Sequence, residues 1–449
     1  MDSKWVGWRR DTSGRALRGH MFRGAMMMCL KRKVMRTSGF WICALGLMSA
    51  SDVFAAGFAN TNQSATATAM AGVGVANTEE PNSSYYNPAA MTLTEFSASV
   101  GDVMIIPSTS FRGDDGSETS TEFNLIPPPN LHLGYSVIPG LAVGVGATFP
   151  YGLTIEWPQD WSGREIVRKQ ALQTMNINPN IAYEIPGSGV SVSAGAQVVF
   201  GSVELTRAIV LRPDGREVDA QLGGDALGFG AGASLLWRPS DEWSFGLNYK
   251  SSVTLDFEGK AHFEGEEDTP FESTFVDQAI STSITLPQTL SAGVGYRDES
   301  LFIGLDVSLT YWNSYDQVEL EFSEPCEAGD PACEVGADST NPPTTVIEGD
   351  WMDSPTFRLG LEYMVRDDLA LRVGAAYDMS PIPDATVSPS LPGNHRGVVS
   401  AGLGYQLDPL RLDLGYQYVA TTREIRNGNN DGFYRTTAHI LGLGASYSF

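Results

Sequence analysis

The residues that could carry out chemistry in this sequence are few, and their spacing does not fit a catalytic or metal site. Neither a His-Glu-x-x-His nor a Gly-x-Ser-x-Gly stretch occurs. Residues 427–432 begin like a calcium-binding loop, but the twelfth position, which should be a glutamate, is Ala438. The histidines after residue 55 are His132, His262, His395 and His439. We therefore expect no enzyme activity, no metal site and no cofactor.

Two cysteines, Cys326 and Cys333, lie after the N-terminal leader described below, in the short polar stretch PCEAGDPAC. Two sulfur atoms without a nearby histidine are too few ligands for a zinc site. In an oxidising compartment, two cysteines this close in a loop favour a local disulfide.

The elements that must position these residues are β-strands, because apolar and polar residues alternate along much of the chain. At the C-terminus, Leu441, Leu443 and Tyr447 alternate with glycines and serines, and the chain ends on Phe449. Period two places one face of a strand in an apolar environment and the other in a polar one. We predict fourteen strands, at 97–111, 129–138, 141–151, 171–185, 188–211, 219–238, 242–262, 283–297, 300–322, 345–365, 368–379, 395–407, 409–424 and 435–449.

The connections between these strands alternate between six tight turns and seven longer polar loops. The tight turns fall near residues 139, 187, 239, 298, 367 and 408. Short turns on one side and long loops on the other are typical of an outer-membrane barrel. The sequence thus predicts an all-β fold, a 14-stranded antiparallel transmembrane β-barrel over residues 97–449, although the mean hydropathy is only −0.12.

The N-terminus carries the marks of export. A short apolar core at 39–50 follows several basic residues and precedes Val53-Phe54-Ala55, which predicts a signal peptide over residues 35–55. Residues 1–34 have no periodicity and are interpreted as a non-native or disordered extension. The rest of the chain holds 19 basic and 50 acidic residues, a net charge of −31, which repels nucleic acid. This charge is either a solvated acidic surface or a surface that divalent cations bridge to lipopolysaccharide.

Residues 56–96 differ from the strands that follow, because small residues and Thr and Asn dominate them. They are too poor in large apolar groups to form a core of their own. Fourteen strands enclose more space than their own side chains fill. We therefore expect this segment to be a hatch, a small plug inside the lumen.

Several stretches in this order resemble the FadL-type outer-membrane transporters of long-chain fatty acids and other hydrophobic compounds. The stretches are Ala56-Gly57-Phe58, Asn87-Pro88-Ala89-Ala90-Met91, Tyr249-Lys250-Ser251 before Phe257-Glu258-Gly259, Leu286-Pro287, Tyr377–Asp384 and the aromatic C-terminus. The resemblance implies passive uptake of a hydrophobic ligand, which enters a pocket in the lumen and leaves sideways through the wall. It also implies a location in the outer membrane of a Gram-negative bacterium and insertion by the barrel-assembly machinery. We expect a monomer.

The resemblance implies roles for two parts of the hatch. Asn87, Pro88 and Ala89 would form a hinge or a seal against the wall; a plain turn between plug and barrel is the alternative. Phe58 would reach into the lumen near the ligand, and its displacement would open the path; otherwise it is a packing anchor.

Phe149-Pro150-Tyr151-Gly152 ends the third predicted strand. Proline gives no N–H to a ladder, and a closed barrel has no edge strand to hold it. Broken backbone is tolerated at membrane depth where it lines a cavity. We therefore interpret these four residues as a lateral gate; the alternative is a strand that ends there before a loop.

A fatty-acid carboxylate would need a cation in the lumen. Four arginines within predicted strands are candidates, namely Arg207, Arg358, Arg372 and Arg435. Each could instead pair with an aspartate or glutamate, so the sequence leaves open whether the ligand is an acid or a neutral hydrocarbon. A general diffusion porin and a structural or adhesive barrel are the alternative functions.

Overall fold

The computed structural model describes residues 57–211, 215–265, 275–323, 337–338 and 344–449. The predicted extension, the predicted signal peptide and both cysteines of the predicted disulfide, Cys326 and Cys333, lie outside the described residues.

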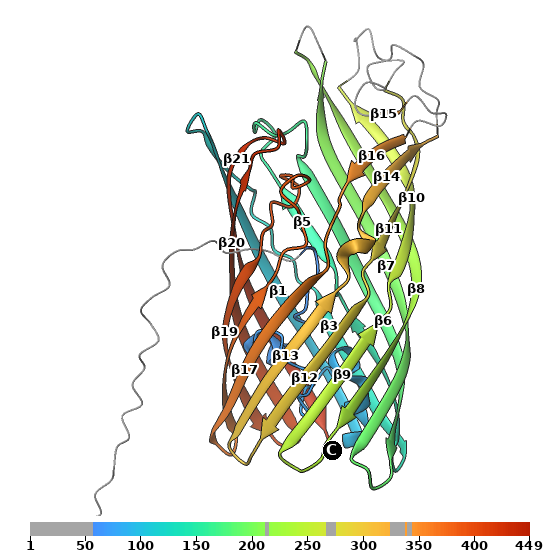
Figure 1. Ribbon diagram of the computed structural model, residues 1–449, viewed down its shortest axis with the longest axis vertical. Coiled ribbons are helices and arrows are strands. Elements are labelled where there is room, and N and C mark those ends of the chain that lie inside the picture. Colours follow the sequence, from blue (N-terminus) through green and yellow to red (C-terminus); the bar gives the residue numbers. More distant parts are fainter. Residues whose placement is uncertain (1–56, 212–214, 266–274, 324–336, 339–343) are drawn as a thin grey trace, which may run out of the picture. The chain divides into compact units, whose positions relative to one another are not determined.

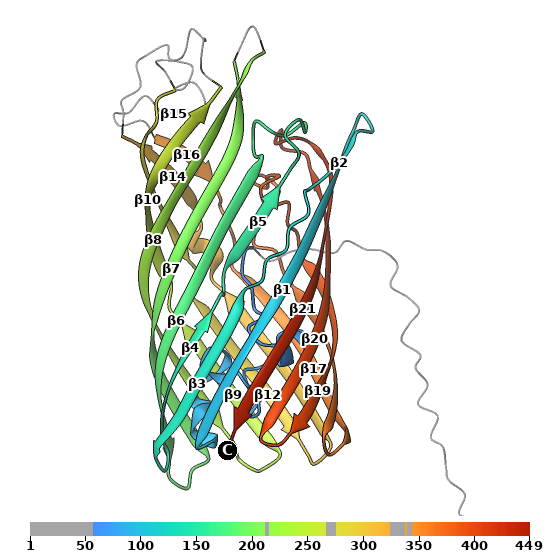
Figure 2. The same ribbon diagram turned by 180° about the vertical axis from the view of Figure 1, so that it is seen from behind.

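The described strands form one antiparallel sheet that closes on itself as a barrel (Figures 1 and 2). The barrel has fourteen wall strands, and some of them are divided by breaks into two labelled strands. The strands are β1 (Phe96–Gly113), β2 (Glu118–Ser120), β3 (Pro129–Ile138), β4 (Leu141–Thr148), β5 (Gly152–Glu156), β6 (Lys169–Ile185), β7 (Val190–Val210), β8 (Glu217–Trp237), β9 (Trp243–Lys250), β10 (Val253–Glu264), β11 (Gln278–Leu286), β12 (Thr289–Arg297), β13 (Leu301–Thr310), β14 (Gln317–Phe322), β15 (Ala337–Asp338), β16 (Thr344–Glu348), β17 (Ser354–Arg366), β18 (Leu369–Asp378), β19 (Arg396–Leu407), β20 (Leu410–Ile425) and β21 (Gly432–Ser448). Antiparallel pairing of β1 with β21, from Ser97 opposite Ser448 to Gly113 opposite Gly432, closes the ring. The predicted 14-stranded barrel is confirmed.

The predicted tight turns are confirmed, and they lie together at the end of the barrel where the C-terminus sits (Figure 1). That end faces the periplasm, because outer-membrane barrels have short periplasmic turns. Trp237 and Trp243 flank one of these turns with 43% and 44% of their surfaces exposed on the outer wall. Their place at the edge of the apolar belt is that of a membrane-interface girdle.

Four predicted strands are interrupted, which the alternation did not reveal, and the predicted strand 141–151 ends early, at the proline of the predicted lateral gate. The breaks are Phe149–Tyr151, Ser251–Ser252, Pro287–Gln288, Tyr311–Asp316 with the short 3-10 helix η2 (Trp312–Ser314), and Gly349–Asp353. Proline cannot donate to a ladder, and Asp350 has a positive φ of 51°, so neither fits an unbroken strand. Three of these breaks place large aromatic side chains, among them Tyr151, Trp312 and Trp351, against Phe58 in the lumen.

Inside the barrel, near the periplasmic end, lie α1 (Ala65–Ala69), α2 (Ser83–Tyr86) and the 3-10 helix η1 (Pro88–Leu93). Ser64 caps α1 by accepting a hydrogen bond from the Ala67 N–H at 3.0 Å. Residues 57–95 are the described part of the predicted hatch that precedes β1, and we keep the name hatch for them. No helix in the described ranges has the length and apolar character needed to cross a membrane.

The hatch fits against the wall because glycines leave room for its backbone. A Cβ atom at Gly246 of β9 would lie 2.1 Å from the Val75 carbonyl oxygen, and one at Gly374 of β18 would lie 2.4 Å from the Met70 carbonyl carbon. The sequence has 48 glycines, and inward-facing ones such as these let the plug contact the strands directly.

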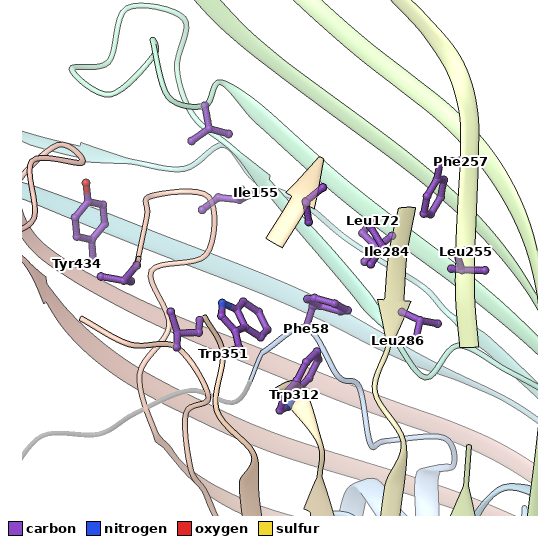
Figure 3. Packing of buried hydrophobic residues seen from close by; sticks show 14 of the residues in the cluster. Phe58, Ile155, Leu172, Leu255, Phe257, Ile284, Leu286, Trp312, Trp351 and Tyr434 are labelled. Atoms are coloured by element: carbon purple, nitrogen blue, oxygen red, sulfur yellow. The ribbon is translucent and has the colours of Figure 1, made fainter. Parts of the chain in front are cut away.

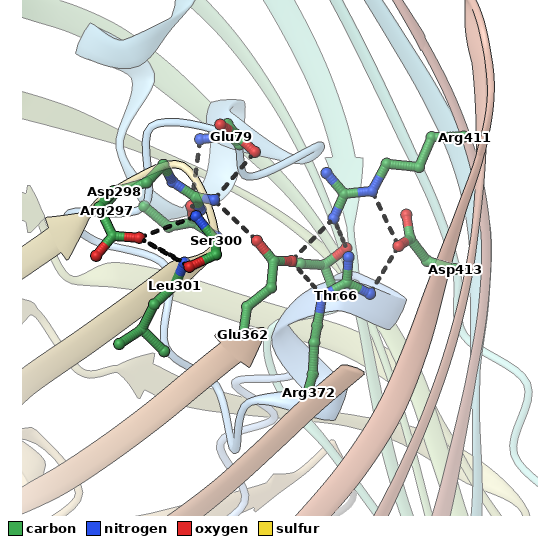
Figure 4. A network of polar contacts seen from close by, with 11 residues as sticks. Thr66, Glu79, Arg297, Asp298, Ser300, Leu301, Glu362, Arg372, Arg411 and Asp413 are labelled. Carbon is green, nitrogen blue, oxygen red and sulfur yellow. Dashed lines mark hydrogen bonds and ion pairs between the residues drawn. The ribbon is translucent and has the colours of Figure 1, made fainter. Parts of the chain in front are cut away.

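A buried network of charges ties the hatch to four strands (Figure 4). Glu362 of β17 lies at its centre, 2.9 Å from Arg297 of β12 and 2.6 Å from Arg372 of β18. Arg372 also pairs with Asp413 of β20 at 2.8 Å. Arg411, which pairs with Asp413 as well, donates to the hydroxyl of Thr66 in α1. Arg297 reaches the loop before α2 through Asn77 and Glu79.

Candidate functional site: a hydrophobic lumen above the hatch

The extracellular half of the lumen contains an apolar cavity of about 590 Å³. Its lining comes from strands far apart in sequence, including Leu172 of β6, Phe257 of β10 and Ile284 of β11 (Figure 3). These side chains alternate with outward-facing residues of the same strands, so they point inward by the period of the strand. A cavity of this size and lining suits an oily molecule of moderate length. We call it the upper cavity.

Phe58 forms the floor of the upper cavity and sits among aromatic rings (Figure 3). Its ring centroid lies 4.8 Å from Trp312, 5.5 Å from Tyr315, 5.7 Å from Trp351 and 6.1 Å from Tyr151. Most of these contacts are edge-to-face, the arrangement that aromatic quadrupoles favour. Phe58 is 5% exposed, so its ring fills the space between the four others.

Phe149-Pro150-Tyr151 interrupts the third wall strand of the barrel, between β4 and β5. The hatch supplies its hydrogen bonds: the Asn60 N–H donates to the Pro150 carbonyl at 2.8 Å, and the Gly152 N–H donates to the Phe58 carbonyl at 2.9 Å. Gln63 bonds both backbone groups of Phe149. The start of the hatch therefore replaces the strand partner that this break lacks.

The wall beside this break has few ladder bonds. Within the described residues, β5 pairs with β6 and with no second strand. On this side, the part of β1 between its ladders with β3 and β2 has one β-bridge, Ile105 to Ile126. Two single backbone bonds join it, from the Val103 N–H to the Pro128 carbonyl and from the Thr121 N–H to the Thr109 carbonyl. A cavity of about 530 Å³ lies here, lined by Pro107 and Ile126 on one side and by Phe58 and Leu153 on the other. We call it the side cavity.

Asn87, Pro88 and Ala89 connect the hatch to the wall. The Asn87 side chain accepts from the Ala89 N–H at 3.2 Å and donates to the carbonyls of Val75 at 2.8 Å and Leu235 of β8 at 3.1 Å. The Ala89 N–H also donates to the hydroxyl of Ser234. Pro88 starts η1, where its missing N–H leaves no donor unsatisfied. This geometry suits a rigid seal.

The four candidate arginines have different surroundings. Arg207 lines the upper cavity and, among the described residues, makes no hydrogen bond or ion pair. Arg358 is 6% exposed, faces the lumen below Phe58 and donates to the Ser308 hydroxyl at 2.9 Å.

The other two arginines do not line the cavities. Arg372 is committed to Glu362 and Asp413 in the buried network. The expectation that Arg435 faces the lumen is wrong: this residue is exposed on the outer wall. It has the same strand parity as the exposed Leu441 and Leu443, whereas the buried Tyr434 next to it points inward.

Of the four aromatic residues around Phe58, Tyr151 was predicted as part of the gate, whereas Trp312, Tyr315 and Trp351 were not foreseen as part of the site. Trp312 and Trp351 fall within predicted strands, yet both lie in strand breaks. Turn-forming residues beside them, Asn313-Ser314 and Gly349-Asp350, are the signal that could have revealed these breaks.

Glu80 of the hatch is a buried carboxyl group whose protonation should affect stability. It is 6% exposed, and burial raises its pKa to about 7. This pKa lies above the unfolded value near 4.5. The contribution of Glu80 to the free energy of unfolding should therefore be largest below pH 4.5 and should be lost as the pH rises through 7. We expect Glu80→Gln to remove about 3 kcal/mol of this decline.

Urea unfolding of the protein in lipid vesicles at several pH values measures the difference. Asp115→Asn, on an exposed loop, is the control for a carboxyl group without burial. Identical pH profiles for wild type and Glu80→Gln would contradict the expectation.

A fourteen-stranded barrel with a hatch at its periplasmic end and an apolar lumen above it defines a transport protein of the bacterial outer membrane. Residues 46–449 match the family model described as outer membrane protein transport protein (OMPP1/FadL/TodX). The chain belongs to this family, so the resemblance predicted from the sequence is confirmed.

Relatives and solved structures agree with this assignment. The chain is 24% identical over 411 residues to the long-chain fatty acid transport protein of Escherichia coli K12, covering 81% of this chain and 87% of that protein. A Pseudomonas aeruginosa FadL homologue has a TM-score of 0.75 at 19% identity, covering 88% of this chain and all of the other. The Ralstonia pickettii toluene transporter TbuX has a TM-score of 0.66 at 15% identity, covering 86% and 98%. These two structures support the fold.

Proposed function

We propose that this protein takes up long-chain fatty acids or other hydrophobic molecules across the outer membrane by passive diffusion with lateral release. The observation that carries the proposal is the lumen itself: two apolar cavities meet at Phe58, and the hatch fills the barrel below them. Within the part of the chain that the structure describes, an oily ligand entering from outside finds no apolar cavity that continues along the axis to the periplasm. The side cavity offers a route toward the wall.

In the proposed route, the ligand first occupies the upper cavity and then displaces Phe58. The hatch backbone at Phe58 and Asn60 is bonded to Pro150 and Gly152, so movement of Phe58 would also release the hydrogen bonds at the strand break. Phe149, Pro150, Tyr151 and Gly152 would then act as the lateral gate. Asn87-Pro88-Ala89 would hold the rest of the hatch in place as a seal.

The lining and the relatives support the proposed substrate class. Relatives are named as transporters of long-chain fatty acids, and structural neighbours as transporters of toluene and monoaromatic hydrocarbons. Apolar side chains would hold either type, and Arg207 would contact the carboxylate of an acid. Arg358 lies deeper and would contact a headgroup only after Phe58 moves.

The remaining features of the chain fit this role. We infer that residues 35–55 are a signal peptide after a non-native or disordered extension at 1–34, and that residues 56–96 and 97–449 are the hatch and the barrel. The proposal also includes a disulfide between Cys326 and Cys333 and a monomeric state. In the outer membrane, we expect insertion by the barrel-assembly machinery and contact with lipopolysaccharide. Catalytic activity is not part of the proposed function. General porin conductance is not part of it either, because the hatch and the aromatic residues around Phe58 fill the bore.

The gate is tested with Pro150→Ala. Alanine restores an N–H that can join the ladder, so we expect uptake of a fluorescent long-chain fatty acid to fall severalfold in cells that lack their own transporter. Pro239→Ala, in a periplasmic turn, is the matched control. Uptake equal to wild type would favour a plain strand end over a gate.

Phe58→Ala should have the opposite effect. Loss of the ring removes roughly 3–5 kcal/mol of packing, so the start of the hatch should leave the aromatic cluster more often. We expect a severalfold higher initial rate in the same uptake assay. Phe123→Ala removes the ring of a residue that is 77% exposed, so it should leave the rate unchanged. A rate at or below wild type would show that Phe58 is only a packing anchor.

A further inference from the structure

A second, polar cavity lies below Phe58, between the aromatic cluster and the hatch. Its volume is about 70 Å³. Tyr85 of the hatch, Lys250 of β9 and Asp306 of β13 are among its lining residues. We call it the lower cavity. Water occupies about 30 Å³ per molecule in the liquid, so the space suits a carboxylate-sized group or a few waters.

The charges that line the lower cavity do not cancel. They are Lys250, Arg358 and Arg396 against Asp306 and Asp378, which leaves one positive charge. Arg396 forms an ion pair with Asp378 at 2.7 Å. Arg358 forms no ion pair among the described residues, but it lies opposite Asp306 in the register of β13 and β17, so the two opposite charges face the same cavity. The hatch also stabilises the Asp306 carboxylate, because the Gly74 and Val75 N–H groups donate hydrogen bonds to it.

Lys250 is the cation that remains. Its ammonium group lies 3.1 Å from the centroid of the Tyr85 ring, and among the described residues it makes no hydrogen bond or ion pair. By contrast, Lys169 on the rim pairs with Glu204 at 2.8 Å. A cation–π contact offsets only part of the free energy of taking an ammonium ion out of water. An anion beside Lys250 would offset the rest.

We propose that the lower cavity binds one small monovalent anion at Lys250, either a carboxylate headgroup or a free halide. Both carry one negative charge and fit beside an ammonium group. The halide site stands independently of the transport route. The carboxylate as its source rests on the proposed function, because the ligand would have to arrive through the upper cavity.

The position of the lower cavity makes the carboxylate source geometrically consistent. Tyr151 and Trp312 line the lower cavity and contact Phe58, which lines the upper one. Ala59 and Pro150 also line it, so the parts that separate the two cavities are those that would move in the proposed route. An acid could then hold its tail among the apolar residues above and its headgroup at Lys250. A neutral hydrocarbon would gain nothing from Lys250.

The test uses the full-length protein with Lys250→Met and Lys250→Arg. Lys260→Met is the control, because Lys260 is an exposed lysine on the outside of β10. Crystals soaked in bromide report the anion by anomalous scattering. Equilibrium binding of hexadecanoate and of hexadecanol reports whether the headgroup charge matters. Lys250→Arg keeps the charge and serves as a folded reference should Lys250→Met fold poorly.

We expect a bromide peak beside residue 250 in wild type and Lys250→Arg and its loss in Lys250→Met. If the carboxylate is the occupant, Lys250→Met should bind hexadecanoate about 10- to 100-fold more weakly and hexadecanol equally well. A bromide peak with unchanged hexadecanoate binding would assign the site to a free halide. Absence of the peak together with unchanged hexadecanoate binding would overturn the proposal. Failure of wild type to bind either lipid would instead count against the proposed transport function, while the bromide result still decides the anion site.

Discussion

Replacing Glu362 with alanine should destabilise the folded barrel by about 3–5 kcal/mol, because it leaves buried arginines without their shared partner. Arg297 and Arg372 both bond to Glu362 at distances below 3 Å, and the carboxylate is 3% exposed. The attraction is strong in this poorly solvated interior, and so is the penalty for an unpaired charge. Urea unfolding of protein refolded into lipid vesicles measures the change in free energy.

Asp368→Ala provides the control for this prediction. Asp368 pairs with Arg366 at 2.8 Å, but both side chains are largely solvated at a periplasmic turn. Such exposed pairs contribute less than about 1 kcal/mol. If Glu362→Ala is no more destabilising than Asp368→Ala, the network does not hold the hatch and barrel together in the way described.

Gly246→Ala should convert the closed barrel into a leaky one. The added Cβ would lie 2.1 Å from the Val75 carbonyl oxygen, far inside the 3.0 Å that real Cβ atoms respect. The wall and the hatch cannot both keep their positions. We expect the hatch to move, because continuous ladders hold β9 to its neighbouring strands. We expect ion conductance in planar bilayers to rise about tenfold or more above the wild-type background, since a barrel of this size without its filler encloses water.

The matched control for this conductance measurement is Gly223→Ala on β8. There the nearest heavy atom to an added Cβ is the Val203 carbonyl oxygen at 3.6 Å, an ordinary contact, and the hatch is not involved. Conductance should stay at background. A tight, unaltered barrel in Gly246→Ala would mean that the hatch can shift without opening a path.

Most of the barrel could be predicted from the sequence, because alternation and turn chemistry act locally. Alternation near Leu301 and Leu410 predicts strands there, and the turns near 139 and 408 fall where the structure has them. Pro150 indicated the break at Phe149–Tyr151, but the other strand breaks escaped this reasoning. Trp312 and Trp351 continue an apolar pattern, and only their contacts with Phe58, more than 250 residues away in sequence, bring them into the lumen.

The candidate site was predicted less well than the fold, for two different reasons. Arg435 could have been placed correctly, since it has the same parity as Leu441 and Leu443 in one strand. Arg372 could have been paired with Glu362, because the turn at Arg366–Asp368 sets them opposite each other. Asp413 could not have been foreseen as a second partner of Arg372. It lies on β20, and β19 separates β20 from the strand that carries Arg372. The same holds for the solitary charge of Lys250.

The seam between the first and last strands has a consequence for how the molecule is assembled. Seventeen residue pairs join β1 to β21, and the backbone of the terminal Phe449 bonds to that of Phe96, directly after the hatch. A folded hatch would not enter a barrel in which β1 and β21 are already paired. We infer that the hatch is enclosed while the curved sheet is still open, and that the pairing of β1 with β21 comes last.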